Sequence, residues 1–248
     1  SELTYWRGES KSYYDGKGWT QPNPKLEPFV ASYPSSGQPV VQQEILLNGK
    51  MSNKQLFLGG QLRSVDMLLN DRGTPMSSGS LFISETSGLT TLPEIADPIS
   101  YYKVTVQPVR ENPDLLNTDI GPYPEEITSD YLQLPALLPR TVRSLAEQVT
   151  ANRVTPYAKA VAIEQYLSHT FPYSLEKPTN PSRSEDFVSH FLFVDRTGYC
   201  DHFSTAMVVM LRSVGVPARW VKGFAPGTVH AVDDNGLQEV VVRNQDAH

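Results

Sequence analysis

Cys200 is the only cysteine of the 248-residue chain, and its neighbours are of the types that a thiol nucleophile needs. It follows Gly198 and Tyr199 directly. Phe203 begins an apolar pattern at helical spacing that continues to Val214. The spacing therefore predicts a helix that begins at Cys200, where the helix dipole and the free backbone N–H groups favour a thiolate. The same N–H groups could stabilise an oxyanion on a substrate carbonyl, and Gly198 could let a substrate backbone approach closely.

A thiol nucleophile also needs a base. His202 lies two residues after Cys200, about 200° around a helix axis, so we expect its ring to point away from the thiol and to pack near the site. His248 follows a predicted strand, Gln238–Arg243, and is better placed to approach from another element, as cysteine–histidine catalysis requires. The remaining histidines fit ordinary surface or capping roles: His169, His190 and His230. On the residues alone, Cys200 is either a structural thiol or a nucleophile.

The first half of the chain has no sustained helical periodicity. Short apolar runs separated by Gly-Gly, Asp-Arg-Gly and Ser-Ser-Gly turns predict an antiparallel β domain over residues 1–120. The predicted strands are Val40–Leu47, Gln55–Leu58, Leu81–Ser84 and Tyr101–Val106. A proline-rich connection over residues 121–138 follows. Trp6, Trp19 and the Tyr13-Tyr14 pair could belong to the β-domain core or to a docking surface.

Residues 139–248 have the pattern of an α+β domain. Helical periods cover residues 138–149, and Thr155-Pro156 is typical of a helix start and opens a helix to about His169. A short helix is expected at 187–193. Gly215 and Pro217 end the helix of Cys200. The strands Ala218–Phe224 and Gln238–Arg243 follow, with an Asn235-Gly236 turn between them. We therefore predict an α+β fold.

Composition excludes several classes of function. The formal net charge is −6, and no run of Lys and Arg exceeds a pair, so nucleic-acid binding has no electrostatic footprint. No window approaches the roughly 18 to 20 apolar residues that a membrane span needs. Apolar residues at 39% and aromatic residues at 10% are enough for a folded core.

The segment "GYCDHFSTAMVVMLRSVGVPARWVKGF" resembles the core of bacterial transglutaminase-like proteins. "VVVRNQDAH" is similar to the second family motif, a strand that ends in Asp-Ala-His, and "YLSHTFPYSL" and "DFVSHFLF" are similar to the preceding helix and loop. The N-terminal "YWRGESKSYYDGKGWTQP" is similar to the segment that follows the last membrane helix in membrane-anchored members. The resemblance covers both ends of the chain and carries little over residues 20–110.

The resemblance implies that Cys200 is the nucleophile and His248 the base, with Tyr199, Gly198 and His202 at the oxyanion site or packed behind it. The family's triad ends with an aspartate on the strand after the histidine. The printed chain ends at His248, so we expect it to be a piece of a longer protein with impaired activity. Asp246 does not occupy the position of the family's acid.

The implied activity is thiol-dependent acyl transfer on a carboxamide, most often protein glutamine γ-glutamyl transfer, with no required cofactor and no metal. The partners would be a protein or peptide with glutamine side chains and an amine donor, and the membrane through segments outside this chain. The implied location is the extracytoplasmic face of the bacterial cell membrane. Two alternatives stay open: a cysteine peptidase or amidase with the same triad, and a non-catalytic ectodomain that binds a partner.

Overall fold

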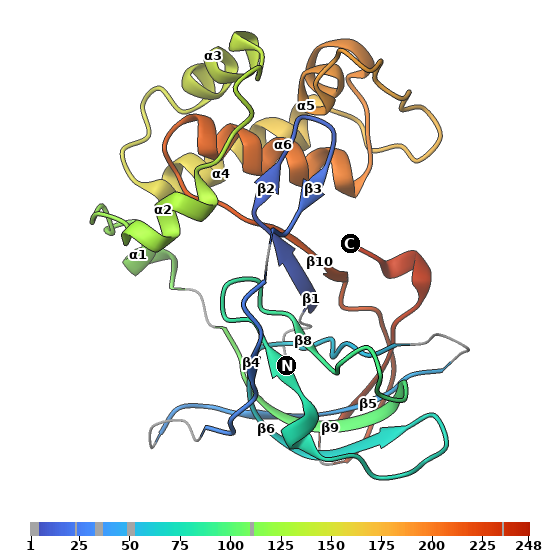
Figure 1. The fold of residues 1–248 in the computed structure, drawn as a ribbon. Helices are drawn as coiled ribbons and strands as arrows, with labels where there is room; N and C mark the ends of the chain where they lie inside the picture. Colours follow the sequence, from blue (N-terminus) through green and yellow to red (C-terminus); the bar gives the residue numbers. More distant parts are fainter. Residues whose placement is uncertain (1–4, 23, 33–36, 49–52, 110–111, 235) are drawn as a thin grey trace. The chain divides into compact units, whose positions relative to one another are not determined.

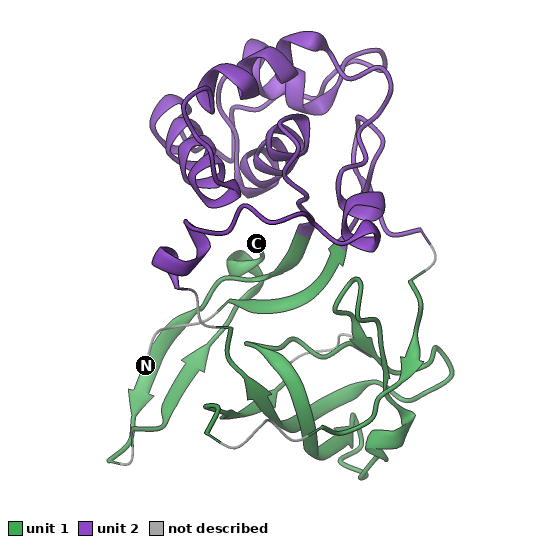
Figure 2. Cartoon of the chain, turned by 90° about the vertical axis from the view of Figure 1, so that its left-hand side faces the viewer, with its two compact units in different colours: residues 1–10, 23–110, 221–248 green, residues 11–22, 111–220 purple. Residues whose placement is uncertain are grey.

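The computed structural model describes residues 5–22, 24–32, 37–48, 53–109, 112–234 and 236–248. Its contacts divide the chain into two compact units, each described by itself here (Figure 2). Unit 1 contains residues 1–10, 23–110 and 221–248, and unit 2 contains residues 11–22 and 111–220. The sequence predicted three consecutive segments, 1–120, 121–138 and 139–248. In the structure, each unit instead contains segments that are separated in the sequence. Strands near both ends of the chain pair in unit 1, and residues 11–22 pack among the helices of unit 2.

Unit 1 is built on two antiparallel sheets (Figure 1). The larger has the order β5 (Val41–Leu46), β9 (Ile99–Gln107) and β6 (Gln61–Asn70). The smaller has the order β4 (Glu27–Pro28), β7 (Phe82–Ile83) and β8 (Thr90–Thr91). Alternate residues of β9 are buried and form a core with side chains of the neighbouring segments: Leu56, Leu62, Leu68, Leu81, Ile99, Tyr102, Val104 and Val106. The antiparallel β architecture predicted for the first half is confirmed.

Gln55–Leu58 and β6 (Gln61–Asn70) are two places in unit 1 where the structure differs from the prediction. Gln55–Leu58 makes only isolated bridges, Gln55 to Thr91 and Leu58 to Arg7, and is not a regular strand. β6 was not predicted, because its register against β9 shifts at three places and its burial does not alternate cleanly.

The C-terminal segment of unit 1 takes part in two further strand pairs. β1 (Trp6–Lys11) pairs with β10 (Trp220–Phe224), and β11 (Thr228–Val232) pairs with β12 (Gln238–Val241). The prediction missed β11, whose five side chains are all exposed in the structure. Of the predicted Asn235-Gly236 turn, Asn235 lies outside the described residues.

Unit 2 is helical, and its boundaries follow local sequence signals. Thr155 caps α4, its hydroxyl accepting the Ala158 N–H at 3.1 Å, and Gly215 takes a left-handed φ of 79° just after α6. The helices are α1 (Pro113–Leu116), α2 (Glu125–Tyr131), α3 (Arg140–Val149), α4 (Pro156–Thr170), α5 (Phe187–His190) and α6 (Cys200–Ser213). A π-helical turn, Phe191–Asp195, follows α5. The predicted helices are confirmed, and the α+β class with them. Among the described residues, no helix is both long and apolar enough to span a membrane.

The core of unit 2 surrounds α6 and includes the hairpin of β2 (Tyr13–Tyr14) and β3 (Trp19–Thr20). Tyr14 is fully buried and donates its hydroxyl to Asp186 at 2.9 Å. The Trp19 indole donates to the Thr205 hydroxyl of α6 at 3.1 Å. These aromatic residues therefore belong to the helical core and not to the β unit.

Arg212 of α6 joins three separate segments of unit 2. Its side chain is 3% exposed. The guanidinium donates to the carbonyl oxygens of Ala218 at 2.7 Å, Ser12 at 2.7 Å and Gln133 at 2.8 Å. It also lies 5.0 Å from the centre of the Trp19 ring. Burial lowers the pKa of Arg212 to about 10, so the group stays cationic at neutral pH.

We expect Arg212→Lys to lower the free energy of unfolding by about 2–4 kcal/mol, because an ammonium cannot reach three carbonyls in fixed directions and each buried, unpaired acceptor costs about 1–3 kcal/mol. Urea unfolding followed by tryptophan fluorescence measures this. Arg143→Lys, on the exposed face of α3, is the matched control and should change little. Equal stability of the two variants would contradict the role of Arg212.

Candidate active site

Cys200 is the first residue of α6 and is partly exposed. Its Sγ lies 3.9 Å from the Asp201 carboxylate. The Ser204 hydroxyl donates to the Cys200 carbonyl at 2.8 Å and accepts from the Trp220 indole at 2.8 Å. Trp220 in turn stacks on Trp19, with ring centres 6.1 Å apart. The hydrogen bonds of Ser204 and the stacked rings of Trp220 and Trp19 thus hold the first turn of α6 in place.

The electrostatic setting of the thiol differs from what the helix start suggested. Burial, followed by the charge of Asp201, raises the pKa of Cys200. Hydrogen bonds from the backbone of Asp201, from Tyr173 and from the Cys200 backbone act in the opposite direction without cancelling this. The group is therefore a thiol at neutral pH unless a base or a cation favours the thiolate.

Tyr173 is a neighbour of the thiol that the sequence did not single out. It lies just beyond α4 and forms a parallel bridge with Gly198. Its ring packs on Phe203, with centres 6.1 Å apart. The only sequence signal was an aromatic residue two positions after a helix end, which is too common to indicate a site.

His202 is buried, and its ring packs against Tyr199 and Phe187. Its Nδ1 accepts the Tyr199 backbone N–H at 3.4 Å, and its ring stacks on Phe187 with centres 4.7 Å apart. The Tyr199 ring meets it edge-on at 4.4 Å. Burial lowers the pKa of His202, so the imidazole is neutral at pH 7 and acts as a hydrogen-bond acceptor at the start of the helix.

Gly198 has a packing reason to be glycine. A Cβ there would lie 2.6 Å from the His202 Cβ and 3.0 Å from the Phe191 ring. Gly198 is buried between these side chains, so close packing explains the residue without the substrate approach suggested by the sequence.

His248 belongs to unit 1, where its backbone is paired with β10. Its N–H donates to the Gly223 carbonyl at 2.9 Å, and its carbonyl accepts the Gly223 N–H at 2.8 Å. The imidazole is exposed and lies 5.4 Å, centre to centre, from the Tyr5 ring. Asp246 is used locally, because its carboxylate accepts the Arg243 N–H at 2.7 Å within the preceding turn.

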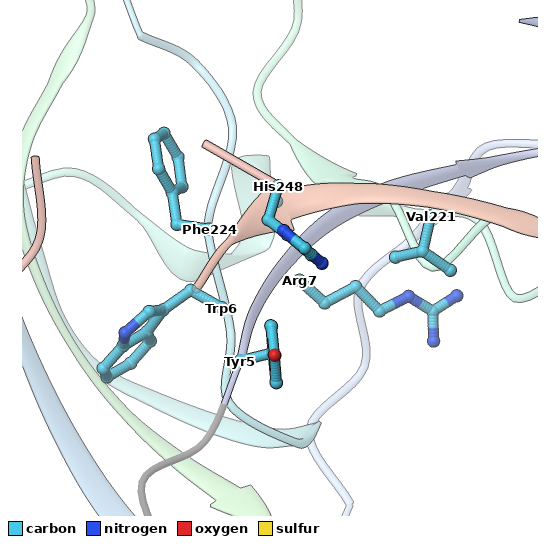
Figure 3. Close-up of a pocket in the computed structure, with 7 residues that line it drawn as sticks. Tyr5, Trp6, Arg7, Val221, Phe224 and His248 are labelled. Atoms are coloured by element: carbon cyan, nitrogen blue, oxygen red, sulfur yellow. The ribbon is translucent and has the colours of Figure 1, made fainter. Parts of the chain in front are cut away.

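A small cavity of about 240 Å³ lies beside His248 in unit 1 (Figure 3). In the figure, Trp6 and Phe224 lie on one side of the Tyr5 and His248 rings, and Arg7 and Val221 lie on the other. Gly223 completes the lining, and a Cβ there would collide with the Trp6 carbonyl oxygen. This glycine lets β1 and β10 approach closely next to the histidine.

The structure groups Gly198, Tyr199 and His202 around Cys200 in unit 2 and places His248 in unit 1. Unit 2 therefore contains the half-buried thiol of Cys200 at a helix start, and unit 1 contains the exposed imidazole of His248, whose backbone is paired with β10. Within the described parts of the chain, His, Cys, Asp and Glu side chains form no group of three or more that could hold a metal ion.

Comparison with known proteins shows which proteins this chain is similar to. Residues 143–248 match the model of the Transglutaminase-like superfamily. The whole chain is 33% identical to the Uncharacterized protein YebA of Bacillus subtilis and spans 35% of its length. Over 118 residues it is 36% identical to a Protein-glutamine gamma-glutamyltransferase of Pseudomonas aeruginosa, covering 47% of this chain and 17% of that protein. The chain thus spans about a third or less of the length of these relatives.

The fold itself is similar to that of a solved structure, the periplasmic domain of TgpA from Pseudomonas aeruginosa. With the form bound to ethylmercury, the TM-score is 0.68 at 24% identity, over 99% of this chain and 77% of that one. With a second structure of the same domain, the TM-score is 0.67 at 23% identity, over 99% of this chain and 76% of that one.

We expect Gly198→Ala to destabilise the chain by about 1–3 kcal/mol, because the added methyl group overpacks the contact with His202 and Phe191. Urea unfolding measures the change. Gly18→Ala is the matched control, since a Cβ at Gly18 meets nothing within 4 Å. A Gly198→Ala variant as stable as Gly18→Ala would disprove the packing role.

Asp201→Asn should lower the pKa of Cys200, because the neighbouring negative charge that disfavours the thiolate is removed. The pH profile of iodoacetamide alkylation should therefore move to lower pH and alkylation at pH 7 should become faster. The readout is specific, since the chain has one cysteine. Glu164→Gln, exposed on α4, is the control and should leave the pH profile of alkylation unchanged. If Asp201→Asn also gave the profile of the parent chain, the effect of the Asp201 charge on the Cys200 pKa would be refuted.

Proposed function

With a transglutaminase-like core in residues 143–248 as the premise, we propose that this chain is a cysteine acyltransferase that acts on protein glutamine side chains. The observation that carries the proposal is the half-buried thiol of Cys200 at the start of α6, inside that core. The 36% identity to a protein named as a glutamine γ-glutamyltransferase supports the choice of reaction. The whole protein's substrates belong to the same proposal.

In the proposed reaction, His248 takes the proton of the Cys200 thiol, and the sulfur attacks the carbon of a γ-carboxamide. Backbone N–H groups at the start of α6 stabilise the negative charge that develops on the carbonyl oxygen. The C–N bond then breaks, His248 returns its proton, and ammonia leaves. The resulting thioester is attacked by a primary amine, which forms the new amide and releases the thiol.

The raised pKa of Cys200 explains why the proposed mechanism needs the histidine. A thiol whose ionisation is disfavoured by burial and by Asp201 is a weak nucleophile at neutral pH until a base takes its proton. The same raised pKa is the observation that favours the second candidate, a non-catalytic domain with a structural thiol. Rapid alkylation of Cys200 at pH 7 would argue against that candidate.

We also propose an extracytoplasmic location. Its support is the fold similarity over 99% of this chain to a domain described as periplasmic. Attachment to a membrane through segments outside this chain belongs to the same proposal.

We expect the chain to incorporate a fluorescent primary amine into a glutamine-rich protein, and Cys200→Ser to reduce the rate by at least about a thousandfold. Ser168→Ala, on the exposed face of α4, is the control. Cleavage of the protein without amine incorporation would point to the peptidase alternative, and no thiol-dependent turnover by this or a longer chain would contradict the proposal.

A further inference from the structure

His190 is a buried histidine that no step of the proposed reaction uses. It is the last residue of α5 and is 8% exposed, although the sequence suggested a surface or capping role. The π-helical turn that follows it leads to the turn before Cys200. The segment of residues 172–186 precedes α5 and bonds to that same turn, since the Ser174 N–H donates to the Gly198 carbonyl at 2.7 Å. His190 therefore lies between two segments that both reach the turn before Cys200.

The Nε2 atom of His190 is a hydrogen-bond donor. The hydroxyl oxygen of Thr179 lies 2.9 Å from it. That hydroxyl donates its single proton to the Asp195 carboxylate at 2.8 Å, so from the imidazole it can only accept. The same carboxylate lies 3.5 Å from Nε2 and also accepts the Thr179 N–H at 2.7 Å. Two acceptors therefore face Nε2, and the proton of a neutral ring belongs there.

The other ring nitrogen, Nδ1, has no matching partner when the ring is neutral. It is buried and has no hydrogen-bond partner among the described residues. The Oε2 atom of Glu185 lies 3.5 Å from it, and the Ser182 N–H holds this carboxylate in place at 2.8 Å. With its proton on Nε2, a neutral imidazole turns an acceptor at Nδ1 toward a carboxylate, which is also an acceptor. The imidazolium, in contrast, has a donor for each carboxylate.

We propose that His190 is a proton-controlled clamp: as an imidazolium it binds a carboxylate at each ring nitrogen and holds residues 172–186 against the turn before Cys200. Because the protonated ring has the partners, the stabilisation is present at low pH and is lost as the pH rises. Imidazoles exchange their second proton between about pH 5 and 8, so the segment is held more firmly in mildly acidic than in mildly alkaline solution. The clamp is a property of the fold and requires no acyl transfer.

The other charged and titratable groups near His190 have separate partners or stay neutral. Burial lowers the pKa of His202 on α6, so that ring is neutral at pH 7. Lys17, between β2 and β3, donates its ammonium to backbone carbonyls of residues 182 and 185. Asp186 caps α5 and accepts the Tyr14 hydroxyl. The charged residues of α3, which packs on α5, are exposed: Arg140, Arg143 and Glu147. The two carboxylates are therefore the charges that favour a proton on His190.

Hydrogen exchange of two amides measures the clamp directly. The Thr179 N–H donates to the Asp195 carboxylate and the Ser182 N–H to the Glu185 carboxylate, so each amide reports on one side of the imidazole. We expect their protection factors to fall about three- to tenfold from pH 6 to pH 8, because a hydrogen bond between charged groups at a partly exposed site is worth about this factor. Exchange detected by NMR, corrected for the intrinsic pH dependence of amide exchange, is the measurement.

His190→Gln should remove the pH dependence at both amides, since an amide side chain does not titrate. Glu185→Gln changes a partly exposed side chain and keeps an oxygen for the Ser182 N–H. It should remove the dependence at Ser182, and it decides the matter if His190→Gln does not fold. His169→Gln, on the exposed face of α4, is the matched control and should follow the parent chain. Protection that stays constant with pH in the parent chain would overturn the proposal, and so would a fall at Ser182 that persists in Glu185→Gln.

Discussion

The buried guanidinium of Arg212 is the constraint on which the helical unit depends. It is charged, only 3% exposed, and donates through Nε and Nη1 to the carbonyls of Ala218, Ser12 and Gln133, which belong to three separate segments. A cation in such a place is stable only if those carbonyls stay where they are. The residue therefore fixes the N-terminal hairpin, the segment before α3 and the chain beyond α6 relative to one helix. Cys200 lies at the other end of that helix.

The residues around Cys200 stabilise the start of α6 and do not favour ionisation of the thiol. A neutral, buried His202 accepts the N–H of Tyr199, and Gly198 is small enough to let that ring in. Burial and Asp201 disfavour the thiolate, which the backbone donors do not offset. A thiol kept protonated until a base acts is protected from oxidation and from unwanted electrophiles, because the thiolate is the reactive form.

Local signals in the sequence predicted the helical unit well. The caps at Thr155 and Gly215 and the apolar stripe of α6 are determined within a few residues, and so is the position of Cys200 at a helix start. The missed features depend on distant contacts. The strand β11 is exposed throughout. Tyr14 is part of the core of unit 2 and bonds to Gln133, 119 residues away. Tyr173 lies beside the turn before Cys200 only through its bridge to Gly198. The raised pKa of Cys200 was hidden for the same reason, since burial is a property of the packed unit.

The hairpin of residues 13–20 also affects when the helical unit can fold during synthesis. Trp19 and its partner Thr205 are 186 residues apart in the sequence. At synthesis rates of about 5–20 residues per second, the indole is made roughly ten to forty seconds before the helix that covers it. During that interval the Trp19 side chain lacks the hydroxyl partner that it has in the folded unit. The helical unit is completed only when residues up to Trp220 have been made.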